Sequence, residues 1–232
     1  MMRLDRFLAH VGLGTRKDVK VLIRTRRISV NNKIVISDSA QVNTSVDIVK
    51  FDEQVLTYKE FKYFLLNKPQ GYVCANEDNL SPTVIALNDE FSRFEVHTVG
   101  RLDKDTTGVL ILTNNGRLTH KLISPKYKIK KVYLATVDQV LEPDLITSFK
   151  QGFVVNNEYL TLPAELEILS NYEARLTLIE GKYHQVKRMF AHFGYKVISL
   201  HREQFHTLGV EGLEVGDSRE LTSEEETTLF ID

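Results

Sequence analysis

The stretch Val99–Thr113, VGRLDKDTTGVLILT, joins a polar turn to an apolar run. The run VLILT (109–113) is short and bounded by turn residues, so it predicts a buried strand. Two interpretations of the turn are open. Polar residues fill most turns, and an Arg beside an Asp is often a surface ion pair of little energetic weight. Alternatively, Asp103 is a reactive carboxylate, held next to a rigid strand and supplied with a charged partner from another segment.

The composition is that of an ordinary globular protein, with 232 residues, 42% hydrophobic and 26% charged. This length suits one large domain or two smaller ones. No apolar run is long enough to cross a bilayer, and the N-terminus lacks the apolar core of a signal peptide. Cys74 is the only cysteine, which excludes an internal disulfide and fits a reducing compartment. We therefore expect a cytoplasmic protein without a membrane segment.

Charge is distributed unevenly along the chain. Residues 1–33 contain nine Lys or Arg and two Asp, a net charge of +7, whereas residues 211–232 contain eight acidic residues and one Arg, a net charge of −7. A charge run is usually a solvated face. A basic end is also typical of a nucleic-acid contact, and the pattern around it must decide between the two.

The basic end has the pattern of a small α and β unit. Leu4, Phe7, Leu8 and Val11 have the spacing of one helical face, and Gly12 and Gly14 end that helix. Thr15 and Asp18 predict the N-cap of a second helix, which buries Val19, Leu22 and Ile23. ISVNNKIVI (28–36) predicts two short strands around Asn31-Asn32, and DIVKF (47–51) predicts another.

In order and type, these parts resemble the S4 RNA-binding domain over about the first 45 residues. The resemblance implies that the basic second helix faces an RNA backbone, where it positions the protein more than it distinguishes bases. The alternative is a basic but merely solvated helix. The candidate RNA contacts are Arg3, Arg16, Lys17, Lys20, Arg24 and Arg27.

Beyond a polar segment at 51–60, expected to be a linker, the pattern changes to many strands and few helices. Strands are predicted at 62–66, 109–113, 131–137, 164–169, 174–179 and 196–200. Helices are predicted after Pro143, at about 183–193 and from the capped TSEEE segment at 222–226. This mixture indicates an α+β fold with a largely antiparallel mixed sheet. The expected domains are 1–56 and 57–232.

The usual cofactor and metal signatures are missing from this sequence. It has neither a phosphate loop ending in GK[ST] nor a G-x-G-x-x-G motif, and no Cys or His pair has metal-ligand spacing. The seven scattered histidines are expected to be surface or hydrogen-bonded structural residues. The sequence therefore implies no metal and no nucleotide cofactor.

Three polar clusters lie beside predicted strands: residues 100–108, the Lys130-Lys131-x-Tyr133 segment, and EGKYHQVKRMF at 180–190. In the third cluster, Lys187 lies beside the apolar stripe of a helix. A partly buried lysine needs a counter-charge, because desolvating it alone is costly. Asp103 is the best available partner, so an Asp103–Lys187 ion pair is predicted.

Several segments resemble the small-subunit (RsuA) branch of the RNA pseudouridine synthases, whose members join an S4 domain to a catalytic domain. The resemblance covers essentially the whole chain. The matching segments are YFLLNKPQGYVC (63–74), VGRLDKDTTGVLILTNNG (99–116), KKVYLATV (130–137), EGKYHQVKRMFAHFG (180–194), LHREQF (200–205) and RELTSEEE (219–226).

Site roles follow from this resemblance, residue by residue. Asp103 matches the essential aspartate, a nucleophile or a base on the sugar, and Arg101 matches the arginine that helps hold the flipped-out nucleotide. Tyr133 matches the aromatic residue that stacks on the base and removes the C5 proton. Lys187 matches the basic residue paired with the aspartate, and Val186 matches the aliphatic residue of the pocket. The implied reaction needs no cofactor.

The resemblance also implies a substrate, 16S ribosomal RNA, and we expect a monomer that acts on a small-subunit assembly intermediate. Two alternatives remain open. The same chemistry on 23S ribosomal RNA would use the same two domains. A non-catalytic S4-type ribosome-binding or assembly factor would explain the basic end but not the three polar clusters.

Overall fold

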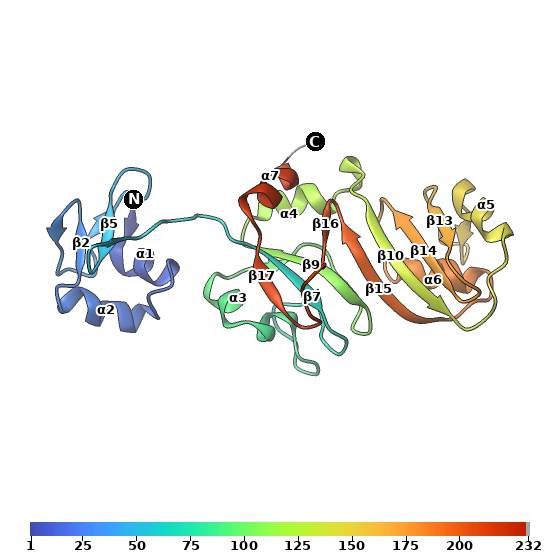
Figure 1. Cartoon of the computed structure of the whole chain (residues 1–232), viewed down its shortest axis with the longest axis horizontal. Coiled ribbons are helices and arrows are strands. Elements are labelled where there is room, and N and C mark those ends of the chain that lie inside the picture. The colour runs from blue at the N-terminus through green and yellow to red at the C-terminus, as the bar shows by residue number, and fades with distance from the viewer. Residues whose placement is uncertain (231–232) are drawn as a thin grey trace. The chain divides into compact units, whose positions relative to one another are not determined.

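The structure, a computed structural model, describes residues 1–230 and consists of two compact units (Figure 1). The first unit comprises Met1–Phe61 and the second begins at Lys62. Each unit has its own apolar core.

The first unit begins with two helices, α1 (Leu4–His10) and α2 (Arg16–Arg24). The predicted N-cap is confirmed as a capping box: the Asp18 backbone N–H donates to Thr15 Oγ1 at 3.3 Å, and the Thr15 N–H donates to Asp18 Oδ2 at 3.0 Å. The apolar sides of both helices are buried, which leaves the basic side of α2 exposed. The buried residues are Leu4, Phe7, Leu8, Val19 and Ile23.

Two small sheets complete the first unit. One has the order β3-β2-β5-β6, and β1 pairs with β4 in the other. Asn31 and Asn32 both have positive φ, 50° and 63°, as the predicted two-residue hairpin turn requires. The strands are β1 (Met2–Arg3), β2 (Ile28–Val30), β3 (Lys33–Ile34), β4 (Gln41–Val42), β5 (Val49–Phe51) and β6 (Gln54–Val55).

The linker expected at 51–60 is wrong for most of its length. Its start forms β5 and β6, which pair with each other, and Leu56 and Tyr58 then pack against the core of the first unit. Tyr58 stacks on Phe7, with ring centroids 5.5 Å apart. Hydrophobic contacts therefore attach this polar-looking segment to the first unit.

A nine-stranded sheet organises the second unit, with the main order β13-β14-β10-β15-β9-β7-β17. Among the strands described, only β9 and β15 pair in parallel within it, so the predicted α+β, largely antiparallel fold is confirmed. Its strands are β7 (Tyr63–Lys68), β8 (His97–Thr98), β9 (Thr107–Thr113), β10 (Lys131–Val137), β13 (Glu165–Ile168), β14 (Glu173–Leu178), β15 (Val197–Phe205), β16 (Leu208–Gly209) and β17 (Ser218–Glu220).

The central strands β7 and β9 are buried on both faces, which explains their continuous apolar sequence. One face packs against α3 (Asp89–Arg93) and the other against α4 (Gly116–Ile123) and α7 (Ser223–Phe230). The helix expected from TSEEE is thus α7. The opposite half of the sheet carries α5 (Asp144–Gln151) and α6 (Gln185–His192), as Figure 1 shows.

The remaining elements are short and were not predicted. They include the hairpin β11 (Val154–Val155) and β12 (Tyr159–Leu160), and the 3₁₀ turns η1 (Val84–Leu87) and η2 (Pro125–Tyr127). Helix α4 was also missed, although Asn115 caps it by accepting from the Leu118 N–H at 3.2 Å. No helix among the described residues is long and apolar enough to span a membrane.

Gly108 permits the strand pairing that creates the site. Its φ is +102°, and a Cβ at this position would lie 2.2 Å from the Arg202 carbonyl oxygen. The close approach allows β9 and β15 to pair with Arg202 opposite Gly108. Because β15 also pairs with β10, the Asp103 turn that precedes β9 comes close to Tyr133.

Candidate active site

A cavity of about 590 Å³ lies where the three polar clusters of the sequence meet. Its walls include the turn before β9, the start of β10, the loop before α6 and the end of β15. It is large enough for a nucleotide, and charged and aromatic groups converge on it. The clusters are distant in sequence but adjacent here, so this cavity is the candidate site.

Asp103 begins the β-turn that leads into β9, in which the Thr106 N–H donates to the Asp103 carbonyl at 3.1 Å. A fully buried lysine, Lys68 at the end of β7, holds this turn. Its amine donates to the carbonyl oxygens of Pro69 (3.0 Å), Asp103 (3.1 Å) and Thr106 (2.8 Å). Burial lowers the pKa of Lys68. The turn is therefore fixed by an internal cation, a contact that sequence reasoning missed.

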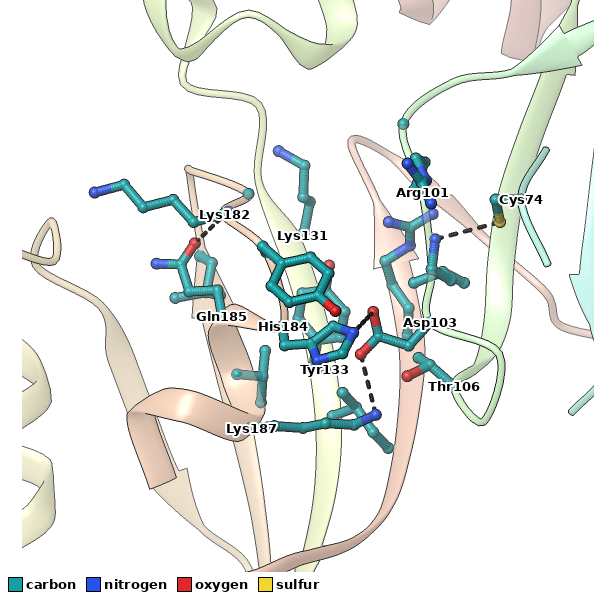
Figure 2. A pocket seen from close by; sticks show the side chains of 18 of the residues that line it. Cys74, Arg101, Asp103, Thr106, Lys131, Tyr133, Lys182, His184, Gln185 and Lys187 are labelled. Atoms are coloured by element: carbon teal, nitrogen blue, oxygen red, sulfur yellow. Dashed lines mark hydrogen bonds and ion pairs between the residues drawn. The ribbon is translucent and has the colours of Figure 1, made fainter. Parts of the chain in front are cut away.

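Two side chains from the α6 region contact the Asp103 carboxylate (Figure 2). Lys187 Nζ lies 3.0 Å from Oδ2, and His184 Nε2 lies 3.3 Å from Oδ1. The predicted Asp103–Lys187 ion pair is thus confirmed, and Lys187 also contacts Asp105 at 2.5 Å. Burial lowers the pKa of Lys187, but its hydrogen bonds to Asp105 and Asp103 outweigh that effect and raise it.

His184 makes a contact that the sequence analysis did not predict: its half-exposed ring reaches the Asp103 carboxylate. It precedes α6 with a φ of +48°, a left-handed conformation that a non-glycine residue seldom adopts. Tyr183 stacks on its ring, with centroids 3.8 Å apart. The signal was present in the i, i+3 spacing of His184 and Lys187, which places both on one side of the helix.

The loop before α6 is built to hold this geometry. Gln185 accepts from the Lys182 backbone N–H at 2.8 Å and donates to the Glu180 carboxylate at 2.6 Å. Glu180 and Gln185 are both buried. Their contacts fix the start of α6, and the helix then directs Lys187 toward Asp103.

Tyr133 and Val186 complete the apolar part of the site. Both side chains are buried and line the cavity. Tyr133 lies on β10, where it is paired with Arg202 of β15 on one side and Leu176 of β14 on the other. An aromatic side chain beside a fixed carboxylate suits a flat, polar ring such as a nucleobase.

Comparison with known proteins agrees with this geometry. Residues 62–192 match the RNA pseudouridylate synthase family, and residues 2–48 match the S4 domain. The ribosomal small subunit pseudouridine synthase A of Haemophilus influenzae is 42% identical over 97% of both chains, and that of Escherichia coli K12 is 38% identical over 97% of this chain and 98% of its own. The chain belongs to the RNA pseudouridylate synthase family.

One solved structure, a pseudouridylate synthase, shares 40% identity and superimposes with a TM-score of 0.70 over 99% of this chain and 100% of its own. Family membership makes the chain an enzyme that isomerises uridine in RNA to pseudouridine. It also brings the S4-like first unit and the synthase unit together in one RNA-modifying protein.

Arg101 lies at the edge of the synthase cavity with an exposed side chain. It forms no ion pair with any residue in the described part of the chain. The next residue is anchored, because the Leu102 N–H donates to Cys74 Sγ at 3.3 Å. Burial raises the pKa of the Cys74 thiol, which suits this structural role. The backbone at Arg101 is thus held while its side chain stays available.

Lys131 and Arg202 also line the cavity of the synthase, and sequence reasoning gave neither a role. Both side chains are buried. Burial lowers the pKa of Lys131 to about 8. Lys131 belonged to a noted polar cluster, but Arg202, in a strand interior, gave no signal that separates it from a surface residue.

The candidate RNA contacts of the S4-like unit differ in how they are paired. Four of them already form ion pairs: Arg3 and Arg16 with Asp5 (3.1 and 3.3 Å), Lys20 with Asp38 (3.4 Å), and Arg27 with Asp52. Lys17 and Arg24 are exposed and have no ion-pair partner within residues 1–230. These two are therefore the cations of α2 most available to an external phosphate.

Proposed function

We propose that this synthase isomerises a specific uridine of 16S ribosomal RNA, in the small ribosomal subunit. The observation that carries the proposal is the Asp103 carboxylate, held by Lys187 and His184 in a cavity that Tyr133 also lines. The choice of RNA rests on full-length relatives named for the small subunit, at 38–42% identity.

The reaction breaks one bond and forms another within the same nucleotide. The N1–C1′ bond of the target uridine breaks, the detached uracil rotates, and C5 bonds to C1′ while the C5 proton leaves. Asp103 acts on the sugar, either as a nucleophile at C1′ or as a base, and needs a free carboxylate for both. Product and substrate are isomers, so the chemistry requires neither a cofactor nor an energy source.

The other site residues bind and orient the nucleotide. Tyr133 stacks on the flipped base and takes the C5 proton, and Val186 packs against it. Stacking of this kind contributes roughly 1–3 kcal/mol per base, which offsets the few kcal/mol needed to flip the base. Arg101, exposed at the edge of the cavity, fills the place of the flipped nucleotide. Lys187 holds Asp103 in position before substrate arrives.

The first unit carries the enzyme to its RNA. Arg3, Arg16, Lys17, Lys20, Arg24 and Arg27 contact phosphates in this scheme. The target uridine must be accessible for flipping, so a partly assembled small subunit is the proposed substrate. We propose a monomer that works in the cytoplasm, where ribosomes are assembled.

Tritium release tests this function directly, because forming the C5–C1′ bond expels the C5 hydrogen. 16S and 23S transcripts labelled at uridine C5, each naked and in partly assembled particles, are incubated with wild type, Asp103→Ala and Asp105→Ala. Asp105 is the matched control, a neighbouring carboxylate that shares Lys187 but is 69% exposed.

We expect release from 16S RNA only, lost in Asp103→Ala and retained within about tenfold in Asp105→Ala. Release from 23S RNA alone would keep the reaction and overturn the choice of RNA. If no RNA or particle releases tritium, the chain is a binding or assembly factor instead.

A further inference from the structure

One patch of the cavity wall contains two cations with no role in the chemistry above. Lys131 and Tyr133 of β10 point to the same face of the sheet, because they are two residues apart. Across the strand pair, Lys131 is opposite Phe205 and Tyr133 is opposite Arg202. The register of β15 shifts between these two pairs, and Lys131, Tyr133 and Arg202 all line the same cavity. The base-stacking tyrosine is therefore next to both cations.

Both cations are held in place but incompletely partnered. The Lys131 amine donates to the Ile129 carbonyl at 3.1 Å, and Arg202 Nε donates to the Val109 carbonyl at 2.7 Å. Arg202 is only 2% exposed, yet its buried Nη2 has no hydrogen-bond partner. Both cations lie over the ring of Phe205, at 5.5 Å for Lys131 Nζ and 5.0 Å for Arg202 Cζ.

No carboxylate of the described residues forms an ion pair with Lys131 or Arg202. Glu180 is the acidic residue whose charge acts on Lys131 and raises its pKa. Its carboxylate is already engaged, because it accepts hydrogen bonds from Gln185 and from the Leu162 N–H and pairs with Lys182 at 3.6 Å. Two buried positive charges without a counter-ion are costly unless an anion arrives. The patch thus has the character of an unfilled anion site.

We propose that Lys131 and Arg202 form a subsite for a phosphate group of the target nucleotide. The subsite rests on the proposed placement of the target base against Tyr133. In Figure 2 the Lys131 amine extends away from the Asp103 carboxylate, so it lies apart from the reacting sugar. The anion that a nucleotide carries there is a phosphate, whereas neutral uracil brings no charge to balance the cations. A phosphate bound here offers an acceptor to Arg202 Nη2, which has none among the described residues.

Mononucleotide binding tests this subsite without any ribosomal RNA. Uridine, uridine 5′-monophosphate and uridine 3′-monophosphate are titrated calorimetrically into wild type, Lys131→Met, Lys131→Arg and Lys130→Met. Lys130 is the matched control, because it is an exposed lysine that immediately precedes β10. The two monophosphates distinguish which phosphate of the nucleotide is bound. Thermal melting of each variant confirms that it is folded.

We expect one monophosphate to bind wild type at least tenfold tighter than uridine does. Lys131→Met should reduce that advantage to less than about twofold, and Lys131→Arg and Lys130→Met should retain it. If neither monophosphate binds more tightly than uridine, or if Lys131→Met keeps the full advantage, the subsite is refuted.

A kinetic measurement provides an independent criterion. On whichever RNA supports tritium release, the slope of log kcat/KM against log salt concentration should be about one smaller for Lys131→Met than for wild type. An unchanged slope would also overturn the proposal. Failure of the small-subunit assignment appears separately, as release from another RNA, and leaves the mononucleotide result untouched.

Discussion

The two walls of the cavity balance their cations differently. On the α6 wall, Lys187 pairs with Asp103 and Asp105, and His184 contacts Asp103. On the sheet wall, the hydrogen bonds of Lys131 and Arg202 within residues 1–230 go to backbone carbonyls, and both cations lie over the Phe205 ring. The cations of the α6 wall are thus balanced by carboxylates without RNA, whereas those of the sheet wall are not.

This difference separates two tasks of the site. A reacting carboxylate works best when its surroundings are already arranged, because no reorganisation is then needed during the reaction. A cation that binds substrate works best when it has no internal partner to release. We expect the first arrangement to stabilise the folded protein and the second to destabilise it when no anion is bound.

The largest effect on activity is expected from Asp103, which pairs with the cations of the α6 wall. Asp103→Asn keeps the shape of the side chain but removes the negative charge that Asp103 needs as a nucleophile or as a base, so single-turnover rates should fall at least ~10³-fold. RNA affinity should stay within about threefold, since phosphate contacts lie elsewhere. Quench-flow tritium release and filter binding measure the two quantities. A variant that retains a tenth of the wild-type rate would show that Asp103 is not the reacting group.

A smaller loss of activity is expected when Lys187, the lysine of the α6 wall, is replaced. Lys187→Met leaves Asp103 with His184 alone, which loosens the carboxylate and should lower kcat by about 10²-fold with little change in KM. Arg188→Met is the matched control, because Arg188 is the next residue on α6 but pairs with Glu158. Equal losses in the two variants would indicate a general effect on α6 rather than a role in positioning Asp103.

On the sheet wall, replacing a lysine should stabilise the folded protein rather than impair it. The Lys131 pKa falls from 10.5 to about 8, chiefly through burial, with Arg202 lowering it further and Glu180 raising it. The folded state then disfavours the ammonium, at a cost of roughly 3 kcal/mol below pH 8. Lys131→Met should therefore raise the melting temperature at pH 7 by several degrees.

The lowered pKa of Lys131 also predicts how the stability difference between the two proteins depends on pH. Between pH 8 and 10.5 the unfolded chain binds the proton that folded Lys131 has released, so wild-type stability rises with pH across this range. The advantage of Lys131→Met should shrink over the same interval and vanish near its upper end. Melting curves of both proteins from pH 7 to 10 test this, and a variant less stable than wild type at pH 7 would contradict an uncompensated charge.

Local patterns in the sequence predicted the features of the fold that depend on a few neighbouring residues. The Thr15–Asp18 capping box and the Asn31-Asn32 turn follow from side-chain and backbone preferences within a few residues. The Asp103–Lys187 pair crossed 84 positions, yet it could be predicted because a lysine beside an apolar helical stripe requires a counter-charge.

The contacts that sequence reasoning missed depend on the order of strands in the sheet. Lys68 supports the Asp103 turn only because β7 pairs with β9, and Arg202 reaches the cavity only because Gly108 admits β15 beside β9. No local propensity distinguishes either side chain from an exposed one. The fold class and the Asp103–Lys187 ion pair were thus predictable from residue patterns, whereas the supporting cations Lys68 and Arg202 required the assembled sheet.

The smallest effect is expected in the first unit. There, too, one cation is unpaired, on α2, and another is paired, just after α2. Lys17 is exposed without an ion pair, whereas Arg27 pairs with Asp52 and lies 4.4 Å from the Phe51 ring. Because a paired cation attracts fewer counter-ions that RNA can release, Lys17→Gln should weaken RNA binding about two- to fivefold and reduce the salt slope by about one. Arg27→Gln should change binding less and lower the melting temperature instead. Equal losses of affinity in the two variants would mean that RNA displaces Asp52 from Arg27, so that internal ion pairing in the first unit does not select its phosphate contacts.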